Sequence, residues 1–142
     1  MHTRETRSFN MSRIRSKDTK PELLVRKFLF SQGYRYRINV KTLPGTPDIV
    51  LRKFNSVIFV HGCFWHGHKN CKYYTIPKTR TLWWKEKITR NKYLDKKNTE
   101  LLRKAGWQVI EIFQCELKPK KLDTTLAKLL LVLSFHEPSD DY

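Results

Sequence analysis

The sequence predicts an α/β domain in which helices flank a mixed sheet. A chain of 142 residues is long enough for one compact domain with its own hydrophobic core. Apolar residues recur with the period of a helix in three segments and with strand-like patterns in four others. In chain order these are a helix, three strands, a helix, a strand and a helix. No internal repeat is present, and we expect a single domain over residues 1–142.

A capping signal predicts the first helix. Thr19 and Glu22 have the spacing of a capping box, in which the threonine accepts a hydrogen bond from the first turn and the glutamate reaches back. Gly33 ends this helix. The apolar residues that share one face of it are Leu24, Val25, Phe28 and Leu29.

After the first helix, the sequence predicts three strands, a long helix, a fourth strand and a last helix. Residues 34–40 alternate with period two, and the prolines and glycine of residues 44–47 force a turn. Two short apolar runs then form a hairpin, and the second half of the chain supplies a long basic helix closed by Gly106, a strand and a leucine-rich helix. The ranges expected for these elements are 48–51, 56–61, 81–105, 107–113 and 124–133.

Strong positive charge points to a polyanionic partner. Lys and Arg number 29 against 13 Asp and Glu, for a net charge of +16. Nucleic acid is the first candidate, because no apolar stretch could span a membrane and no lipidation signal is present. Residues 1–20 are basic and rich in hydroxyl groups, either as a DNA-binding arm or as a frayed terminus. We expect no function for the short tail, residues 136–142.

Histidine and cysteine are concentrated in residues 59–71, which contain three histidines and two cysteines. Imidazole and thiolate are the ligand types that zinc prefers, and a further histidine could move protons near neutral pH. The odd number of cysteines, three, and an N-terminus without a secretory apolar core indicate a reducing cytosol. In that compartment, clustered cysteine and histidine are more often metal ligands than disulfide partners.

A second metal site is expected where two neighbouring strands meet. Asp48 opens one strand and His61 ends the next, so the hairpin can bring the two side chains together. The Asp48 carboxylate suits magnesium, although aspartate after proline is also a common turn residue. His66 lies five residues after His61 across a bend, so both imidazoles could converge on one phosphate. Each histidine could instead be a zinc ligand or a satisfied core residue.

This arrangement resembles the nucleases with a PD-(D/E)xK core, which have the restriction-endonuclease-like fold. Those enzymes combine a helix acid, a Pro-Asp pair that opens one strand, and an acid-x-lysine pair on the next. Pro47 and Asp48 match the pattern, whereas residues 59–61 replace the acid-x-lysine pair with Phe-Val-His. The fold implied is an αβββαβα core with a mixed sheet flanked by helices.

Several short motifs occur in one order along the chain and together resemble the very-short-patch-repair (Vsr) mismatch endonucleases over about residues 6–117. They are Thr6-Arg7-Ser8, Asn10-Met11, Leu43-Pro44-Gly45, Pro47-Asp48, His61-Gly62-Cys63-Phe64-Trp65-His66, Thr79-Arg80-Thr81 and Gly106-Trp107. The resemblance implies an enzyme that nicks one DNA strand 5′ to the thymine of a T:G mismatch. Such a nick starts very short patch repair of deaminated 5-methylcytosine.

The resemblance also implies roles for site residues. Asp48 and the backbone carbonyl of Val60 would bind magnesium, while His66 would be the general base and His61 would support the phosphate or its leaving group. Glu22 would associate with the metal through water, although its place in a capping box is a sufficient structural role. Asp95 is either an outer partner of a catalytic histidine or a solvated helix acid.

Zinc would be held by three sulfurs and one nitrogen in a closed tetrahedral site that stabilises the scaffold. The alternative is three buried free thiols and a surface histidine. Lys69 and Asn70 make the loop one residue longer than in the family, so the choice of His68 over His66 is an inference. The expected ligands are Cys63, His68, Cys71 and Cys115.

Contacts to DNA are expected from aromatic and polar side chains. The resemblance implies that Phe64, Trp65 and Trp84 wedge into the duplex beside the mismatch, where a wobble pair stacks less well. Core packing is the alternative for each aromatic residue. Lys87 and Asn91 would read the mismatch or contact phosphates. The resemblance places a further DNA contact at Met11.

The resulting hypothesis is a magnesium-dependent DNA endonuclease with a structural zinc ion, acting as a monomer on double-stranded DNA that contains a T:G mismatch. We expect it in a prokaryotic cytoplasm, associated with the nucleoid, with a link to a cytosine-5 methyltransferase system and no membrane partner. Two alternatives are a non-catalytic, zinc-containing DNA-binding module and a related PD-(D/E)xK nuclease with a different DNA substrate.

Overall fold

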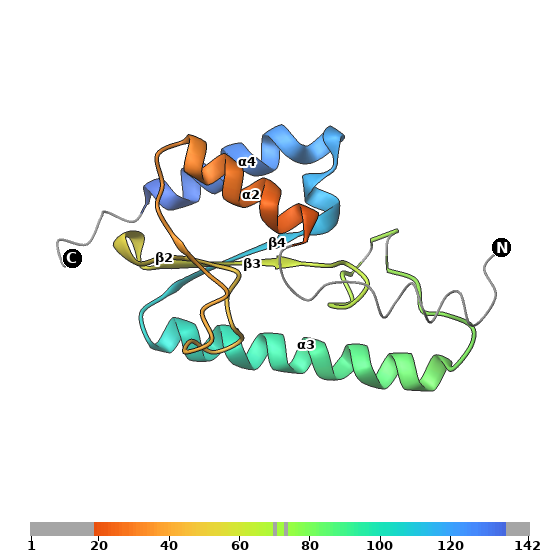
Figure 1. The fold of residues 1–142 in the computed structure, drawn as a ribbon. Helices are drawn as coiled ribbons and strands as arrows, with labels where there is room; N and C mark the ends of the chain where they lie inside the picture. Colours follow the sequence, from red (N-terminus) through yellow and green to blue (C-terminus); the bar gives the residue numbers. More distant parts are fainter. Residues whose placement is uncertain (1–18, 70, 73, 136–142) are drawn as a thin grey trace.

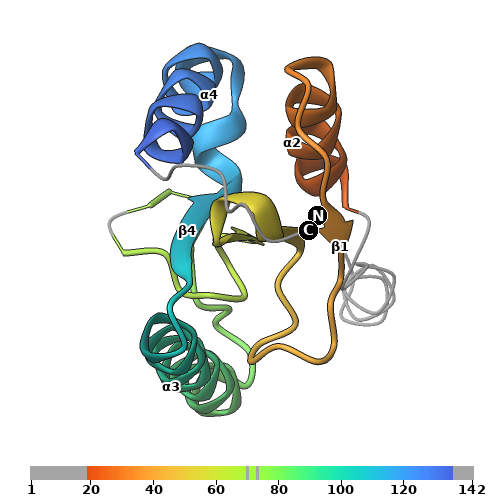
Figure 2. The ribbon, with the colours of Figure 1, turned by 90° about the vertical axis from the view of Figure 1, so that its left-hand side faces the viewer.

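The chain folds into three layers, with a four-stranded sheet between helices. A computed structural model describes residues 19–69, 71–72 and 74–135. Helices α2 (Lys20–Ser31) and α4 (Pro119–Ser134) cover one face of the sheet, and the long helix α3 (Thr81–Lys104) runs beneath the other face (Figures 1 and 2). This architecture confirms the predicted mixed α/β class. The expected arm, Met11 and the acidic tail lie outside the described residues.

The sheet is mixed and has the strand order β1-β2-β3-β4. Strands β1 (Arg37–Ile38), β2 (Ile49–Leu51) and β3 (Ser56–His61) pair antiparallel, whereas β4 (Gln108–Phe113) pairs parallel with β3. A parallel pair needs a long crossover connection, and α3 provides it. A short 3₁₀ turn, η1 (Arg52–Phe54), joins β2 to β3, and Asn55 closes it with φ of 50°.

Strand β1 is much shorter than the predicted strand over residues 34–40. Asn39 adopts a left-handed conformation with φ of 47°, which ends the regular strand. The N–H groups of Asn39 and Val40 still donate to the carbonyls of Asp48 and Pro47, outside the regular ladder. Tyr34 and Tyr36 pack against the core beneath α2 and α4 instead of continuing the strand. Their alternation therefore reflects contacts with helices, and the prediction of a long strand here was wrong.

Helix α4 begins at Pro119, five residues before the predicted start at residue 124. Proline is well suited to the first turn of a helix because its φ is already helical and it needs no hydrogen-bond acceptor there. The lysines that follow Pro119 interrupt the apolar periodicity, so the pattern does not indicate this first turn. The Thr125 hydroxyl donates to the carbonyl of Glu116 at 2.7 Å, which ties α4 to the short 3₁₀ helix η2 (Gln114–Leu117).

Two hydrophobic cores lie on opposite faces of the sheet, and the alternation of β3 decides which side chain enters each. Ile58 and Val60 belong to the core under α2 and α4, while Val57 and Phe59 pack with Leu102 of α3. Because successive side chains alternate across a strand, His61 points to the α3 face, on the same side as Phe59. The rings of Phe59 and His61 are stacked with centroids 5.7 Å apart, in agreement with this placement.

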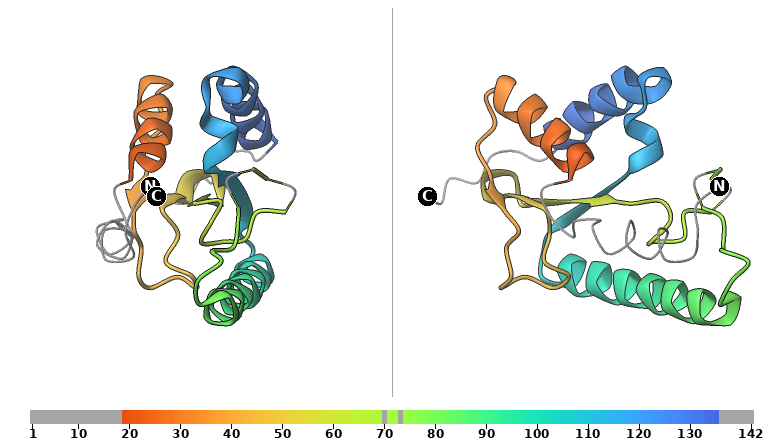
Figure 3. Two further views of the ribbon diagram at one scale, coloured as in Figure 1. Left: turned by 90° about the vertical axis from the view of Figure 1, so that its right-hand side faces the viewer. Right: turned by 45° about the vertical axis from the view of Figure 1, so that its right-hand side comes forward.

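The loop between β1 and β2 is buttressed by helix α3 (Figure 3). Gly45 has φ of 76°, and a Cβ atom there would lie 3.1 Å from the Asn98 Cβ and 3.2 Å from a ring carbon of Phe59. Glycine therefore allows the loop to approach both α3 and β3. None of the helices in the described ranges is long and apolar enough to cross a membrane.

Replacing Gly45 with alanine should destabilise the fold by more than the backbone strain alone, which is about 1–2 kcal/mol for a left-handed residue. The matched control is Gly33→Ala, since Gly33 also has positive φ, 89°, but its added Cβ would meet no atom within 4 Å. Thermal unfolding of both variants separates strain from crowding. Equal losses of stability would show that the loop does not pack tightly on α3.

Candidate active site and metal centre

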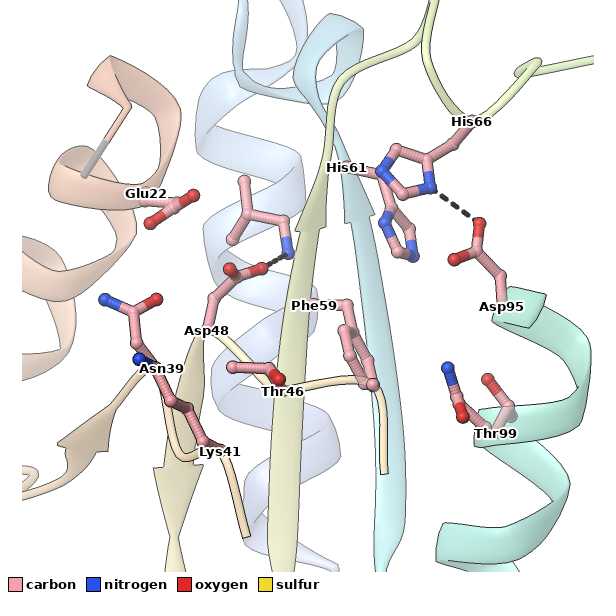
Figure 4. Close-up of a pocket in the computed structure, with 13 residues that line it drawn as sticks. Glu22, Asn39, Lys41, Thr46, Asp48, Phe59, His61, His66, Asp95 and Thr99 are labelled. Atoms are coloured by element: carbon pink, nitrogen blue, oxygen red, sulfur yellow. Dashed lines mark hydrogen bonds and ion pairs between the residues drawn. The ribbon is translucent and has the colours of Figure 1, made fainter. Parts of the chain in front are cut away.

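A cavity of about 560 Å³ opens at the end of the sheet where β2 begins and β3 ends. We call it the carboxylate–histidine pocket. Figure 4 shows carboxylates and imidazoles entering it from α2, from the two strand ends and from α3. The titratable residues expected to act in catalysis, all of which line this cavity, are Glu22, Asp48, His61, His66 and Asp95.

Asp48 is held by the backbone of the neighbouring strand. The Val60 N–H donates a hydrogen bond of 2.6 Å to Asp48 Oδ2, which fixes the carboxylate at the end of β3. Burial raises the pKa of Asp48 from 3.8 to about 7, with the Val60 hydrogen bond opposing this rise and the nearby Glu22 adding to it. Burial destabilises the ionised form of this carboxylate, and a cation placed beside it would stabilise that form.

His66 and Asp95 form the shortest side-chain pair of the pocket. His66 Nδ1 lies 2.6 Å from Asp95 Oδ2, and Asp95 projects from α3 toward the loop that follows β3. A carboxylate at Nδ1 favours the tautomer with its proton there, which leaves Nε2 free to accept a proton. Asp95 is therefore paired with His66 and is not a fully solvated helix acid.

His61 lies deeper than His66 and is only 5% exposed. Burial, together with the neighbouring His66, lowers the pKa of His61 to about 4, so this imidazole is neutral at neutral pH. The two rings have centroids 4.0 Å apart. One ligand atom from each of His61, His66 and Asp95 lies within 4.8 Å of the others, so this cluster could itself hold a cation.

Glu111 is a pocket residue that sequence reasoning missed. Its Oε1 atom lies 4.0 Å from His61 Nε2 and accepts a hydrogen bond from the Thr99 hydroxyl. The available signal was a lone acidic residue inside the apolar strand 107–113. Glu111 lines a second cavity, of about 480 Å³, that shares His61 and His66 with the first.

Glu22 serves the helix start and the pocket together. Its backbone N–H donates to the Thr19 hydroxyl at 3.4 Å, which confirms the threonine half of the predicted capping box. Its buried carboxylate faces Asp48 in the pocket and accepts a hydrogen bond of 3.1 Å from Arg26. Sequence reasoning did not single out Arg26, although four-residue spacing places it on the same face of α2 as Glu22.

A separate sulfur–nitrogen cluster lies beside the pocket. One ligand atom from each of its four residues lies within 4.8 Å of the other three, and this set contains His68 and leaves out His66. Cys115 reaches the cluster from η2, where its Sγ atom is 3.3 Å from His68 Nδ1 and its N–H donates to Cys63 Sγ. The set is Cys63, His68, Cys71 and Cys115.

The donor chemistry of this cluster fits a metal ion. Burial raises the pKa of the Cys63 thiol to about 12 and also raises that of Cys115, so close packing alone opposes thiolate formation. A bound cation would stabilise the thiolates and connect the loop after β3 to the segment after β4. The His68 ring also stacks on Phe113 with centroids 3.9 Å apart, which fixes its orientation.

Aromatic side chains gather where the loop after β3 meets the start of α3. Ring centroids of Phe64, Trp65 and Trp84 lie between 5.2 and 5.6 Å apart, and Trp83 packs at 4.6 Å from Trp84. The Lys87 ammonium lies over the Trp65 and Trp83 rings, at 5.8 and 5.0 Å. These residues form a partly exposed aromatic surface next to His66, as a surface that stacks on bases requires.

Asn91 has a structural contact in addition to its expected role. Its side-chain amide donates to the Trp65 carbonyl at 2.9 Å, so α3 holds the aromatic loop in place. Gly67 has φ of 57° and lies directly against α3, where an added Cβ would come within 2.7 Å of Ile88. The loop that contains His66 is therefore attached closely to α3.

Comparison with known proteins places this arrangement in a family. A family model described as DNA mismatch endonuclease Vsr matches residues 1–72. The chain is 55% identical over 120 residues to the type II nicking enzyme V.NmeAIP of Neisseria meningitidis serogroup A, covering 84% of this chain and 85% of the relative. It is 48% identical over 113 residues to the type II nicking enzyme V.XorIIP of Xanthomonas oryzae pv. oryzae, covering 80% and 82%.

A third relative carries the family's own name. The chain is 39% identical over 121 residues to the DNA mismatch endonuclease Vsr of Escherichia coli K12, covering 85% of this chain and 77% of the relative. These matches do not support the alternative of a non-catalytic DNA-binding module. The chain belongs to the Vsr family of DNA mismatch endonucleases, and it is a DNA endonuclease.

Proposed function

We propose that this endonuclease is magnesium-dependent and nicks one strand of double-stranded DNA 5′ to the thymine of a T:G mismatch. The observation that carries the proposal is the pocket in which Asp48 and the His66–Asp95 pair converge. An oxygen-rich end and a proton-accepting imidazole within one cavity are what hydrolysis of a phosphodiester requires. A PD-(D/E)xK-type core is consistent with Asp48 and His61 at the ends of adjacent antiparallel strands.

Asp48 and the Val60 carbonyl are the proposed magnesium ligands, with Glu22 binding through water. A strand residue directs its N–H and C=O to the same side, and the Val60 N–H already points to Asp48. A buried acid, Glu22, and a half-buried one, Asp48, face one cavity and supply the hard oxygen donors that magnesium prefers. When bound, the ion would stabilise negative charge on the scissile phosphate.

His66 is the proposed general base. Asp95 keeps the Nδ1 proton in place, so Nε2 can take a proton from the attacking water. His61 is neutral and buried behind His66, where it can donate a hydrogen bond to the phosphate or to the departing 3′ oxygen. Asp95 acts through His66, and Glu111 lies beside His61 in the second cavity, so neither needs to touch the DNA.

The aromatic surface is the proposed sensor of the mismatch. Phe64, Trp65 and Trp84 are close to His66 and partly exposed, so bases that stack on them would bring the adjacent phosphate to the pocket. A T:G wobble pair is easier to unstack than a Watson–Crick pair, which favours mismatched sites. The proposed biological role is repair of deaminated 5-methylcytosine in a prokaryotic cytoplasm, by a monomer linked to a cytosine-5 methyltransferase system.

The sulfur–nitrogen cluster is the proposed zinc site. Three sulfurs and one imidazole nitrogen form a closed set of the kind found in structural zinc sites, with no open position for substrate. Its role would be to hold the His66 loop against the segment that follows β4.

Loss of either reacting group should abolish nicking. With magnesium, wild-type protein should nick a T:G duplex and leave T:A and C:G duplexes intact, while Asp48→Ala and His66→Ala should lose about 10²-fold or more in rate. Asp123→Ala, at an exposed acid of α4, is the matched control and should retain full activity. Unchanged rates in the first two variants would refute the mechanism. Equal nicking of all three duplexes would instead indicate a related nuclease with another DNA substrate.

Removal of one sulfur should release the zinc ion. Wild-type protein should contain one zinc per chain, whereas Cys115→Ser should lose zinc and melt at a lower temperature. Elemental analysis and thermal unfolding measure the two effects. His66→Ala is the control and should retain zinc. A zinc content that falls in His66→Ala but not in Cys115→Ser would contradict the ligand set.

The burial of Asp48 should make the magnesium-free protein less stable as pH rises. The folded pKa of about 7 exceeds the ordinary value of 3.8, so the folded state holds a proton between these values that the unfolded state has lost. Stability contributed by Asp48 is therefore lost as pH rises from about 4 to 7. Asp48→Asn keeps an acceptor for the Val60 N–H and removes this titration.

The loss of stability with rising pH should appear as a difference between the melting temperatures of wild type and Asp48→Asn, both zinc-loaded and free of magnesium. The advantage of Asp48→Asn over wild type should be a few degrees at pH 8 and smaller at pH 5. Added magnesium should stabilise wild type more than the variant. The same difference in melting temperature at both pH values would show that the folded protein does not raise the pKa of Asp48.

A further inference from the structure

Arg26 forms a buried ion pair with Glu22, a residue that lines the pocket. Its Nη2 atom lies 3.1 Å from Glu22 Oε2, and the two side chains are 9% and 3% exposed. Glu22 lines the cavity, whereas Arg26 lies one helical turn further along α2 and does not line it. Arg26 can therefore influence the pocket in two ways, through Glu22 and through the field of its own charge.

The ion pair is costly as a device for stability alone. Taking two charged groups out of water carries a desolvation penalty that their attraction often fails to recover, and apolar replacements can be equally stable. The adjacent positions Val25 and Leu29 of the same helix are apolar and buried in the core. A charged pair beside them, with Glu22 lining the pocket, is better explained by what Glu22 does there.

Further contacts hold Arg26 in place and extend its influence. The Tyr36 hydroxyl donates to the Arg26 backbone carbonyl at 2.9 Å, which connects this turn of α2 to the segment before β1. The charge of Arg26 lowers the pKa of Asp48, while that of Glu22 raises it. The three side chains thus form one electrostatic unit in which Arg26 offsets the repulsion between two acids.

We propose that Arg26 is a positioning residue, whose guanidinium fixes the Glu22 carboxylate toward the divalent-cation site that Glu22 shares with Asp48. The inference rests on the magnesium dependence proposed above and extends it to a residue outside the cavity. Arg26 touches neither DNA nor metal. Its favourable effect on cation binding passes through the orientation of Glu22, so that gain in affinity should vanish when Glu22 can no longer act as a carboxylate ligand. The direct field of the Arg26 charge opposes cation binding and cannot account for a loss of affinity in Arg26→Met.

A double-mutant cycle on cation binding tests this dependence. Mn²⁺ binding to zinc-loaded protein is measured by electron paramagnetic resonance for wild type, Arg26→Met, Glu22→Gln and the double variant. Arg26→Met should weaken Mn²⁺ binding about tenfold, the size expected for loss of a partner behind a metal ligand. In the Glu22→Gln background the same change should alter affinity by less than about twofold, because the coupled interaction is already absent.

Nicking of the T:G duplex gives a second readout. Arg26→Met should raise the magnesium concentration needed for half-maximal rate and leave most of the rate at saturating magnesium. Arg26→Lys should restore part of the affinity, since lysine keeps the charge but lacks the planar fork. Lys27→Met, at the exposed neighbour on α2, is the matched control and should change neither quantity. If Arg26→Met does not fold, Arg26→Gln replaces it in the same cycle.

The result that overturns the inference is an equal loss of Mn²⁺ affinity in the wild-type and Glu22→Gln backgrounds, or unchanged affinity in folded Arg26→Met. The two proposals fail in different ways. A wild-type protein that does not nick the T:G duplex contradicts the proposed function. A wild-type protein that nicks it, but shows no coupling between positions 22 and 26, contradicts the role of Arg26 alone.

Discussion

The hydrogen bond from the Val60 N–H to the Asp48 carboxylate fixes the geometry on which the pocket depends. This bond of 2.6 Å joins the start of β2 to the end of β3. One antiparallel hairpin therefore positions both Asp48 and His61, the residue that follows Val60. Everything else in the pocket is arranged around this pair. The carboxylate of Glu22 arrives from α2, and the His66–Asp95 pair arrives from the loop and from α3. The ionised form of the half-buried Asp48 is destabilised by its surroundings, and a cation beside it would relieve that cost.

The loop with His66 has no regular structure, yet its position is determined on several sides. Helix α3 holds it through Asp95, through Asn91 and through the close packing at Gly67. The sulfur–nitrogen cluster connects its far end to Cys115. The aromatic surface lies on the same loop and on the start of α3, so the group proposed to sense the mismatch and the proposed base share one support. A duplex that displaces one of them would displace the other.

Local patterns were enough to predict the order of elements and the presence of Asp48 and His61 at one cavity, because a hairpin places the start of one strand beside the end of the next. The sequence also predicts the sulfur–nitrogen set that contains His68, and its four residues lie together in the structure. Tertiary contacts explain what the sequence did not reveal. The alternation around Tyr36 reflects packing under the helices, so strand β1 is short. Arg26 and Glu111 look like ordinary charged surface residues until the fold brings one into a buried ion pair and the other near His61.

The central claim is that Asp48 and His66 act on opposite sides of one cation-bound phosphate. Anomalous diffraction from crystals of the zinc-loaded protein with a T:G duplex and Mn²⁺ tests it directly. We predict a manganese peak beside the Asp48 carboxylate and the Val60 carbonyl, with the scissile phosphate between this peak and His66 Nε2. Manganese bound elsewhere, or a phosphate out of reach of His66 while Asp48 has no metal, would contradict the account.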